Sequence, residues 1–111
     1  MKRTTLFILA AAMAVLTLSS LQSISSQADC GGAVNISGPA GHKGCLTNLN
    51  TGEIRCFKLD DTGNHYEAKL CAGNYSICIE DWGSASFYSN GASEIGITVS
   101  NNNDCTCPGC P

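Results

Sequence analysis

The chain has 111 residues, of which eight are cysteine and 14% are charged, and its formal net charge is −3. This length allows one domain and excludes a multidomain enzyme. The acidic balance excludes a basic nucleic-acid-binding protein, since such proteins neutralise phosphates with lysine and arginine.

The first 28 residues are predicted to be a secretory signal peptide. Lys2 and Arg3 form a short basic region, and an uncharged run of 13 residues, 6–18, follows it. That length fits the apolar part of a signal peptide, about 7–15 residues, and is short of the roughly 18 needed to span a membrane. Ser26-Gln27-Ala28 gives a small-x-small cleavage pattern before Asp29. An uncleaved N-terminal anchor is the alternative.

Cleavage would leave residues 29–111 as a single disulfide-rich domain that ends in a cysteine-rich tail, 104–111. Four basic residues then remain against nine acidic ones, which gives a net charge of −5. An acidic surface disfavours nucleic acid and anionic membranes as partners. We therefore expect a secreted protein, extracellular or periplasmic, with no membrane association after cleavage.

Short segments with the two-residue alternation of half-buried strands follow one another through this domain, separated by glycine and asparagine turns. No segment shows a sustained helical period. About seven short strands joined by turns predict an all-β fold, a small antiparallel β-sandwich stapled by disulfides. The predicted strands are 33–37, 45–49, 54–59, 66–70, 75–80, 85–89 and 94–100.

The alternation also predicts which side chains face the core. In the fourth and fifth segments these are Tyr66, Ala68, Leu70, Tyr75, Ile77 and Ile79. Cys71 and Cys78 then belong to the outward set. Some disulfides are therefore expected to lie on the sheet surface or to tie strands to the tail.

One stretch carries a resemblance to a known family. Residues 70–79, Leu-Cys-Ala-Gly-Asn-Tyr-Ser-Ile-Cys-Ile, resemble the Leu-x-Ala-Gly-x-Tyr-x-Val-x-Val segment of carboxypeptidase-regulatory-like, or transthyretin-like (prealbumin-like), sandwich domains. The turns at 49–52 and 60–63 resemble the Thr-Gly and Asp/Gly turns of that family, so the resemblance covers roughly residues 31–100. The chain departs from the family in its eight cysteines and in the spacing of Tyr66 from Gly63. The resemblance implies a non-catalytic module for binding, adhesion or spacing, and it brings no catalytic residues.

The cysteines are predicted to be structural. An even number of cysteines in a short exported domain indicates a disulfide framework, here of four bridges, and a core of this size needs such crosslinks. Their pairing stays open, because eight cysteines allow 105 connectivities. The eight are Cys30, Cys45, Cys56, Cys71, Cys78, Cys105, Cys107 and Cys110.

The tail offers two further interpretations. Cys107-Pro108-Gly109-Cys110 has the Cys-x-x-Cys spacing of dithiol redox sites and of half a zinc site. Redox chemistry favours a helix N-terminus before such a motif, which the prolines and the glycine disfavour. Zinc would need a fourth ligand, and His42 or His65 could supply it only by folding back.

Four acidic residues are weak calcium candidates. Calcium takes six to eight oxygen ligands, and two acidic turns could supply them if the turns converge. The simpler interpretation is a pair of solvated turns, so we favour no metal and predict no cofactor. The candidates are Asp60, Asp61, Glu80 and Asp81.

Trp82, Phe87 and Tyr88 lie close together in the sequence around Gly83. They could form an exposed platform for a sugar or a peptide, or they could cap one end of the sandwich core. Asn35 and Asn74 begin glycosylation sequons, which matter only in a eukaryotic secretory pathway.

The sequence offers little for catalysis, since it contains two isolated histidines and no Gly-x-Ser-x-Gly motif. We expect a secreted non-catalytic binding or structural module with a protein or carbohydrate ligand. The first alternative is a small secreted effector of the toxin, protease-inhibitor or antimicrobial type acting on a protein partner. The second is a metal or redox protein that uses the tail, and a thiol-redox role is the one enzymatic activity left open.

Overall fold

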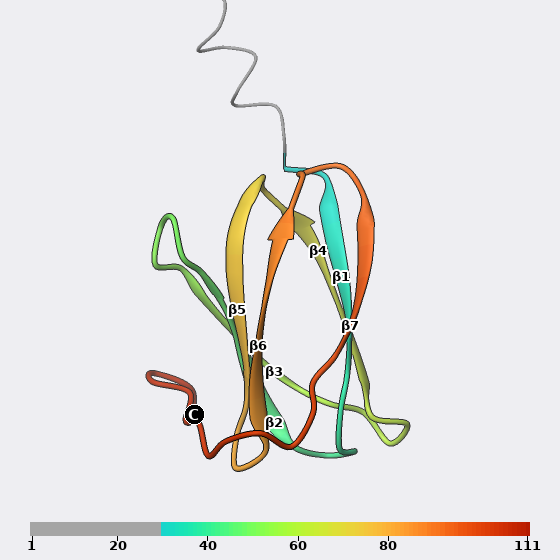
Figure 1. Ribbon diagram of the computed structural model, residues 1–111, viewed down its shortest axis with the longest axis vertical. Coiled ribbons are helices and arrows are strands. Elements are labelled where there is room, and N and C mark those ends of the chain that lie inside the picture. The colour runs from blue at the N-terminus through green and yellow to red at the C-terminus, as the bar shows by residue number, and fades with distance from the viewer. Residues whose placement is uncertain (1–29) are drawn as a thin grey trace, which may run out of the picture.

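The computed structural model describes residues 30–111, and the predicted signal peptide lies outside this range. Within the range there are seven strands and no helix, and the strands form two facing sheets (Figure 1). The predicted all-β sandwich is confirmed. The strands are β1 (Gly32–Ser37), β2 (Lys43–Asn48), β3 (Ile54–Lys58), β4 (Asn64–Leu70), β5 (Gly73–Ile79), β6 (Gly83–Ser89) and β7 (Glu94–Thr98).

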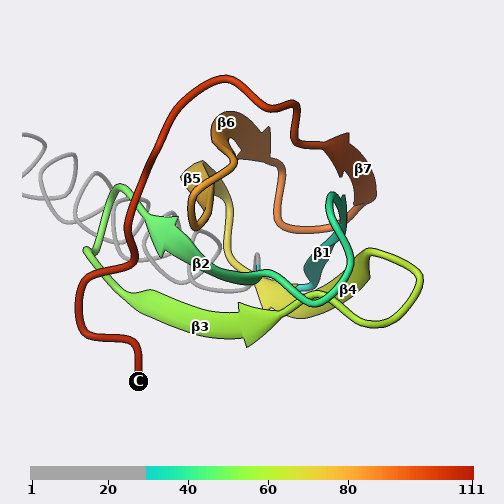
Figure 2. The ribbon, with the colours of Figure 1, turned by 90° about the horizontal axis from the view of Figure 1, so that it is seen from below.

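One sheet has three strands in the order β4-β1-β7, and the other has four in the order β3-β2-β5-β6. Figure 2, which looks along the strands from below, shows the two layers side by side. All neighbours are antiparallel except β1 and β7, which are parallel. That pair departs from the expected antiparallel pattern. A parallel pair needs a long crossover, and here the strands between β1 and β7 provide it.

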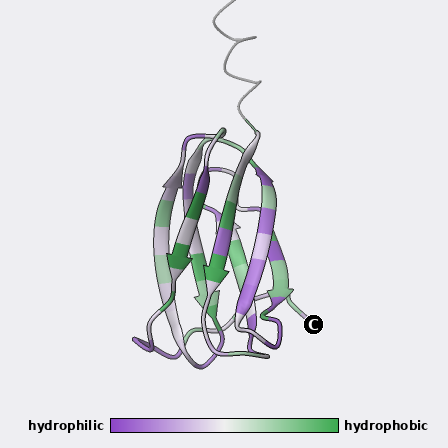
Figure 3. Ribbon diagram, turned by 90° about the vertical axis from the view of Figure 1, so that its right-hand side faces the viewer, coloured by the Kyte–Doolittle hydropathy of each residue, from purple (hydrophilic) through white to green (hydrophobic). Residues whose placement is uncertain are grey.

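The core lies between the two sheets and is small. Apolar and polar residues alternate along several strands, so the inward set of each strand packs against the opposite sheet (Figure 3). Phe57, Trp82 and Phe87 pack against this cluster from its margins. The buried cluster consists of Val34, Ile36, Leu46, Leu59, Leu70, Tyr75, Ile77, Ile79 and Val99.

The predicted core faces are right for β5 and wrong for most of β4. Tyr75, Ile77 and Ile79 are all buried, as their alternation predicts. In β4 only Leu70 is buried, whereas Tyr66 is 53% exposed and Ala68 is exposed.

A β-bulge in β4 explains this reversal. Val34 of β1 pairs with Glu67 and Gly32 pairs with Leu70, so Ala68 and Lys69 together oppose a single residue of β1. Lys69 has a φ of 59°, a conformation that a residue other than glycine adopts only where the surroundings hold it. The extra residue shifts the alternation by one position, which turns Leu70 inward and leaves Tyr66 outward.

Arg55 of β3 binds the bulge from the other sheet. Its guanidinium donates to the carbonyl oxygens of Ala68 at 2.8 Å and Lys69 at 3.1 Å, and to the carboxylate of Glu67 at 3.0 Å. Partial burial lowers the pKa of Arg55, but the hydrogen bonds and charges of Glu67 and Glu53 outweigh it and raise that pKa overall. Arg55 therefore joins the edge strand of one sheet to the edge strand of the other.

An aromatic contact extends this seam between β3 and β4. The rings of Phe57 and His65 stack with centroids 4.5 Å apart and planes 6° from parallel. His65 Nε2 also lies 2.9 Å from a carboxylate oxygen of Glu67. The two edge strands are thus held by a charged cluster and a stacked pair, with no shared backbone ladder.

Replacing Arg55 by methionine is expected to lower the free energy of unfolding by about 2 kcal/mol, because hydrogen bonds to charged groups contribute on that order and the partners lose their donor. Chemical denaturation of the mature protein measures this value. The matched control is Lys58→Met on the same strand, whose exposed side chain faces outward, and it should change stability by less than about 0.5 kcal/mol. Equal effects of the two substitutions would contradict the role given to Arg55.

Candidate functional site: the outer face of the four-stranded sheet

Three of the eight cysteines form a row across the outer face of the four-stranded sheet. Cys45 of β2 pairs in register with Cys56 of β3 on one side and with Cys78 of β5 on the other. Directly opposed residues point to the same face of a sheet. Since Leu46 and Ile77 next to them face the core, the cysteine row faces outward.

The C-terminal tail crosses this row and is bonded to every member of it. Cys105 pairs with Cys78, Cys107 with Cys45, and Cys110 with Cys56. Figure 2 shows the tail leaving β7, passing β6 and β5 and ending beside β3. The order of the tail cysteines follows the order of the strands, so the tail runs across the strands and crosslinks three of them.

The spacing of the tail cysteines suits this path. Neighbouring strands lie about 4.8 Å apart, and two residues of extended chain span about 7 Å, which is enough to reach from one strand to the next. Between Cys107 and Cys110 the chain turns instead, with Gly109 at a φ of 78° and the amide of Cys110 donating to the carbonyl of Cys107 at 3.4 Å. Pro108 and Gly109 therefore form a turn that brings Cys110 to Cys56 of β3.

The fourth disulfide joins Cys30, two residues before β1, to Cys71, directly after β4. No cysteine within residues 30–111 is free. The prediction of four disulfides, some of them tying strands to the tail, is confirmed. Such pairing indicates folding in an oxidising environment.

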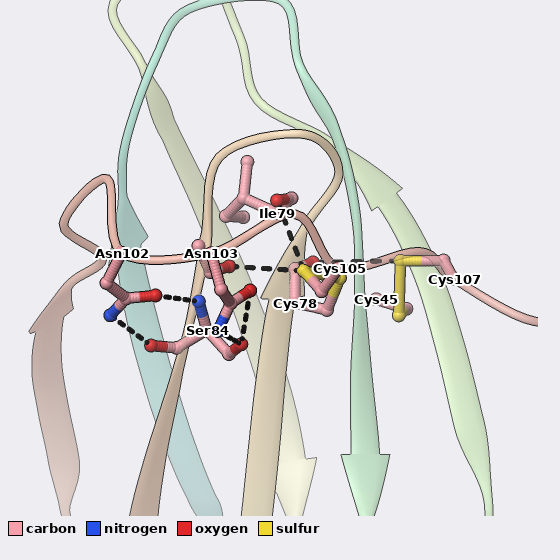
Figure 4. The surroundings of a disulfide bond; sticks show 9 residues. Cys45, Cys78, Ile79, Ser84, Asn102, Asn103, Cys105 and Cys107 are labelled. Atoms are coloured by element: carbon pink, nitrogen blue, oxygen red, sulfur yellow. Dashed lines mark hydrogen bonds between the residues drawn. A yellow bond between two sulfur atoms is a disulfide. The ribbon is translucent and has the colours of Figure 1, made fainter.

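The sulfur atoms of Cys45, Cys78 and Cys107 lie within 4.8 Å of one another. Reduced thiolates at that spacing could hold a metal ion, but here they belong to two neighbouring disulfides (Figure 4). A metal or redox function of the tail would require opening these bridges first.

Asparagine side chains hold the start of the tail against β6. The Asn102 amide accepts from the backbone N–H of Ser84 at 2.9 Å and donates to its carbonyl at 3.0 Å, and Asn103 bonds the Ser84 hydroxyl (Figure 4). The Asn102 side chain thereby occupies both backbone groups that Ser84 would offer to a neighbouring strand. The tail protects this part of the β6 edge.

The tail covers one part of the outer face and leaves an open groove near the β2–β3 hairpin. The groove has a volume of about 500 Å³. In Figure 1 the hairpin leans away from β5 on the same side as the tail. We call this surface the hairpin groove. Its lining residues are Leu49, Asn50, Asn74, Tyr75, Ser86, Phe87 and Tyr88.

Side-chain hydrogen bonds fix the hairpin in place. The Asn48 carboxamide oxygen accepts from the backbone N–H groups of Asn50 at 2.9 Å and Thr51 at 3.2 Å, and Gly52 completes the turn at a φ of 81°. Asn50 then reaches β5, where its oxygen accepts from the backbone N–H of Asn74 at 3.0 Å. The two sides of the groove are therefore held in one geometry.

The residues that line the groove belong to both faces of the sheet, because Tyr75 and Phe87 face the core whereas Leu49 and Tyr88 are exposed. Tyr75 and Phe87 stack with centroids 5.3 Å apart, and the Tyr75 hydroxyl donates to the carbonyl of Cys71 at 2.9 Å. Burial raises the pKa of Tyr75 above its ordinary value. Leu49 is 57% exposed and Tyr88 is 59% exposed, so both offer apolar surface to a ligand.

The three aromatic residues predicted as a platform are separated in the structure. Trp82 lies in the β5–β6 turn, packs against the core and donates from Nε1 to the carbonyl of Val99 at 2.9 Å. Phe87 and Tyr88 are neighbours on β6, so they face opposite sides of the sheet. Only these last two border the groove. The sequence marked Asn50 and Asn74 as turn residues, and their place beside Tyr88 follows from strand pairing alone.

The acidic turns do not converge. The Asp60 carboxylate accepts from the Thr62 hydroxyl at 2.6 Å and from the amides of Thr62 and Asn64, and these bonds lower the pKa of Asp60. Glu80 and Asp81 lie in the β5–β6 turn, which Figure 1 shows well apart from the β3–β4 turn. Within residues 30–111 the four calcium candidates therefore form no common oxygen cluster.

Each of the two histidines packs against an aromatic ring. His42 lies edge-on to Trp82, with ring centroids 6.3 Å apart, and His65 stacks on Phe57. Asn35 and Asn74, the two sequon asparagines, are both exposed, on β1 and beside the groove respectively.

No model of a known protein family matches the chain, and no curated protein matches it. Among residues 30–111 there is also no helix of the length and apolarity that crossing a membrane requires.

Removing one bridge of the cysteine row is expected to cost little. With Cys45–Cys107 intact, Cys56–Cys110 closes only the short loop through the β2–β3 hairpin and the tail turn, and short loops restrict the unfolded chain less. The double variant Cys56→Ala/Cys110→Ala should lose less than about 2 kcal/mol.

The variant lacking all three tail bridges should lose well over three times as much, because the tail is then released and the sheet loses its cover. Urea denaturation of both variants measures this difference. A loss from the single-bridge variant that equals one third of the three-bridge loss would contradict this shared constraint.

Proposed function

We propose that the protein is a secreted, non-catalytic binding module and that the hairpin groove is its ligand-binding surface. The observation that carries this proposal is the exposure of Leu49 and Tyr88 on either side of a groove whose walls are fixed by hydrogen bonds and disulfides. Large exposed apolar side chains gathered on one rigid surface are typical of binding sites.

The chemistry of the lining supports binding rather than catalysis. The groove presents aromatic, aliphatic, amide and hydroxyl groups, and no carboxylate, histidine, lysine or cysteine lines it. General acid–base catalysis most often uses a histidine or a carboxylate, and a serine nucleophile needs such a base beside it. The resemblance of residues 70–79 to transthyretin-like sandwich domains implies the same class of function.

The disulfides support the secreted location. Four bridges in a domain of this size persist only where thiols are kept oxidised, as outside the cell or in the periplasm. The three tail bridges also brace the sheet that carries the groove, so that little flexibility has to be lost when a ligand binds.

The proposal predicts binding that depends on the groove. Mature protein of residues 29–111 is immobilised, and extracellular material from the producing cells is passed over it while bound mass is recorded. Tyr88→Ala should weaken binding at least tenfold, since it removes the main exposed ring. Tyr66→Ala is the matched control, because Tyr66 is similarly exposed, at 53%, but lies on the other sheet.

Near-UV circular dichroism and melting temperature establish that both variants fold. Binding that is absent from the wild type, or that survives equally in Tyr88→Ala and Tyr66→Ala, would contradict the proposed function.

A further inference from the structure

We infer that the ligand of the hairpin groove is a neutral polysaccharide, with a sugar ring stacked on Tyr88 and its hydroxyl groups bound by Asn50 and Asn74. This inference rests on the proposed function, since it names the ligand class of the same groove.

The first argument is the position of Tyr88. It lies on β6 directly opposite Asn74 of β5, and both side chains point to the outer face of the sheet. Tyr88 is 59% exposed, whereas the stacked pair of Tyr75 and Phe87 packs on the inner face of the same sheet. A pyranose ring has C–H groups on its flat faces and hydroxyls around its rim, so it packs on an aromatic face while its polar rim stays available for hydrogen bonds.

The second argument is the set of polar groups beside that ring. Asn50 uses its oxygen to hold the amide of Asn74, and its NH₂ group has no hydrogen-bond partner within residues 30–111. Over the same residues the side chains of Asn74 and Ser86 make no hydrogen bond, and both are exposed. A carboxamide donates and accepts at once, which matches neighbouring hydroxyls that also do both.

The third argument is that these groups are held in place before a ligand arrives. The hairpin is closed by Asn48 and docked on β5 through Asn50. Gly73 has a φ of 152°, and a Cβ atom there would lie 2.5 Å from the Asn50 side-chain oxygen, so glycine is needed for this docking. A fixed amide loses little entropy on binding a hydroxyl.

The fourth argument is charge. None of the groove residues is charged. Two lysines of the same outer face, Lys43 of β2 and Lys58 of β3, lie opposite each other beyond the cysteine row as seen from the groove. Lys43 Nζ donates to the backbone oxygen of Pro111 at 3.4 Å. The disulfide-bonded tail thus lies between these two lysines and the neutral groove. A sulfated or uronic-acid polymer would find no counter-charge in the groove.

The β6 edge also disfavours an extended peptide as the ligand. A peptide that adds to a sheet needs free backbone N–H and C=O groups along the edge strand. At Ser84 the Asn102 side chain already occupies both. A peptide that added to β6 at Ser84 would have to displace the tail, whereas a sugar on Tyr88 and Asn74 would not.

Affinity gel electrophoresis tests the inference directly. The mature protein is run through native gels that contain a mixed-linkage β-glucan, xyloglucan, galactomannan or amylopectin, and through gels that contain polygalacturonate or dextran sulfate. At least one neutral polymer should retard the wild type. Tyr88→Ala and Asn74→Ala should each reduce the affinity at least tenfold, whereas Tyr88→Phe, which keeps the ring, and Tyr66→Ala should stay within about threefold of wild type.

Retardation by none of the neutral polymers would overturn the inference. So would equal retardation of wild type and Tyr88→Ala, or stronger retardation by the charged polymers.

A second experiment separates this inference from the proposed function. The extracellular material of the binding assay is treated beforehand with sodium periodate, which cleaves vicinal diols of sugars, or with proteinase K. Loss of groove-dependent binding after periodate but not after proteinase K supports a polysaccharide ligand. Loss after proteinase K alone overturns the polysaccharide while the binding function stands, and no groove-dependent binding to untreated material overturns both.

Discussion

Three disulfides between the C-terminal tail and the row of Cys56, Cys45 and Cys78 are the constraint on which the rest of this structure depends. They join three neighbouring strands through a single crossing segment. The core between the sheets is too small to hold such a domain with much margin, so covalent crosslinks replace part of the missing apolar burial. The same crossing lies between the two lysines of the outer face, Lys43 and Lys58, and the open neutral groove.

The opposite edge of the sandwich is held by different means. There β3 and β4 belong to separate sheets, and the bulge in β4 turns two carbonyl groups toward Arg55. Because an arginine side chain presents several donors in a rigid fork, one residue can satisfy both carbonyls and the Glu67 carboxylate. The disulfides brace the outside of one sheet, and Arg55 joins that sheet to its partner.

Much of the fold could be predicted from the sequence, because strands buried on one face show a two-residue alternation. Each predicted segment overlaps an observed strand, although β2, β4, β5 and β6 begin two residues earlier than predicted. The bulge in β4 could not be predicted, since neither of its residues is a glycine and Lys69 adopts its positive φ only because its surroundings hold it. The predicted inward orientation of Tyr66 was wrong for that reason.

The site was less predictable than the fold. Tyr88 was a candidate from its side chain alone, but its neighbours in the groove come from segments far apart in the sequence, and only strand pairing brings Asn50 and Asn74 to it. The aromatic cluster around Gly83 looked continuous in the sequence, yet successive strand residues face opposite sides. The disulfide pairing could not be predicted either, because it depends on the strand register that places Cys45 between Cys56 and Cys78.

The most direct test of this account is disulfide mapping of the mature protein by proteolysis under non-reducing conditions and electron-transfer mass spectrometry. The account predicts one tail peptide linked to three strand peptides, with Cys105 bonded to Cys78, Cys107 to Cys45 and Cys110 to Cys56. A bridge between Cys107 and Cys110, or free thiols in the tail, would contradict it.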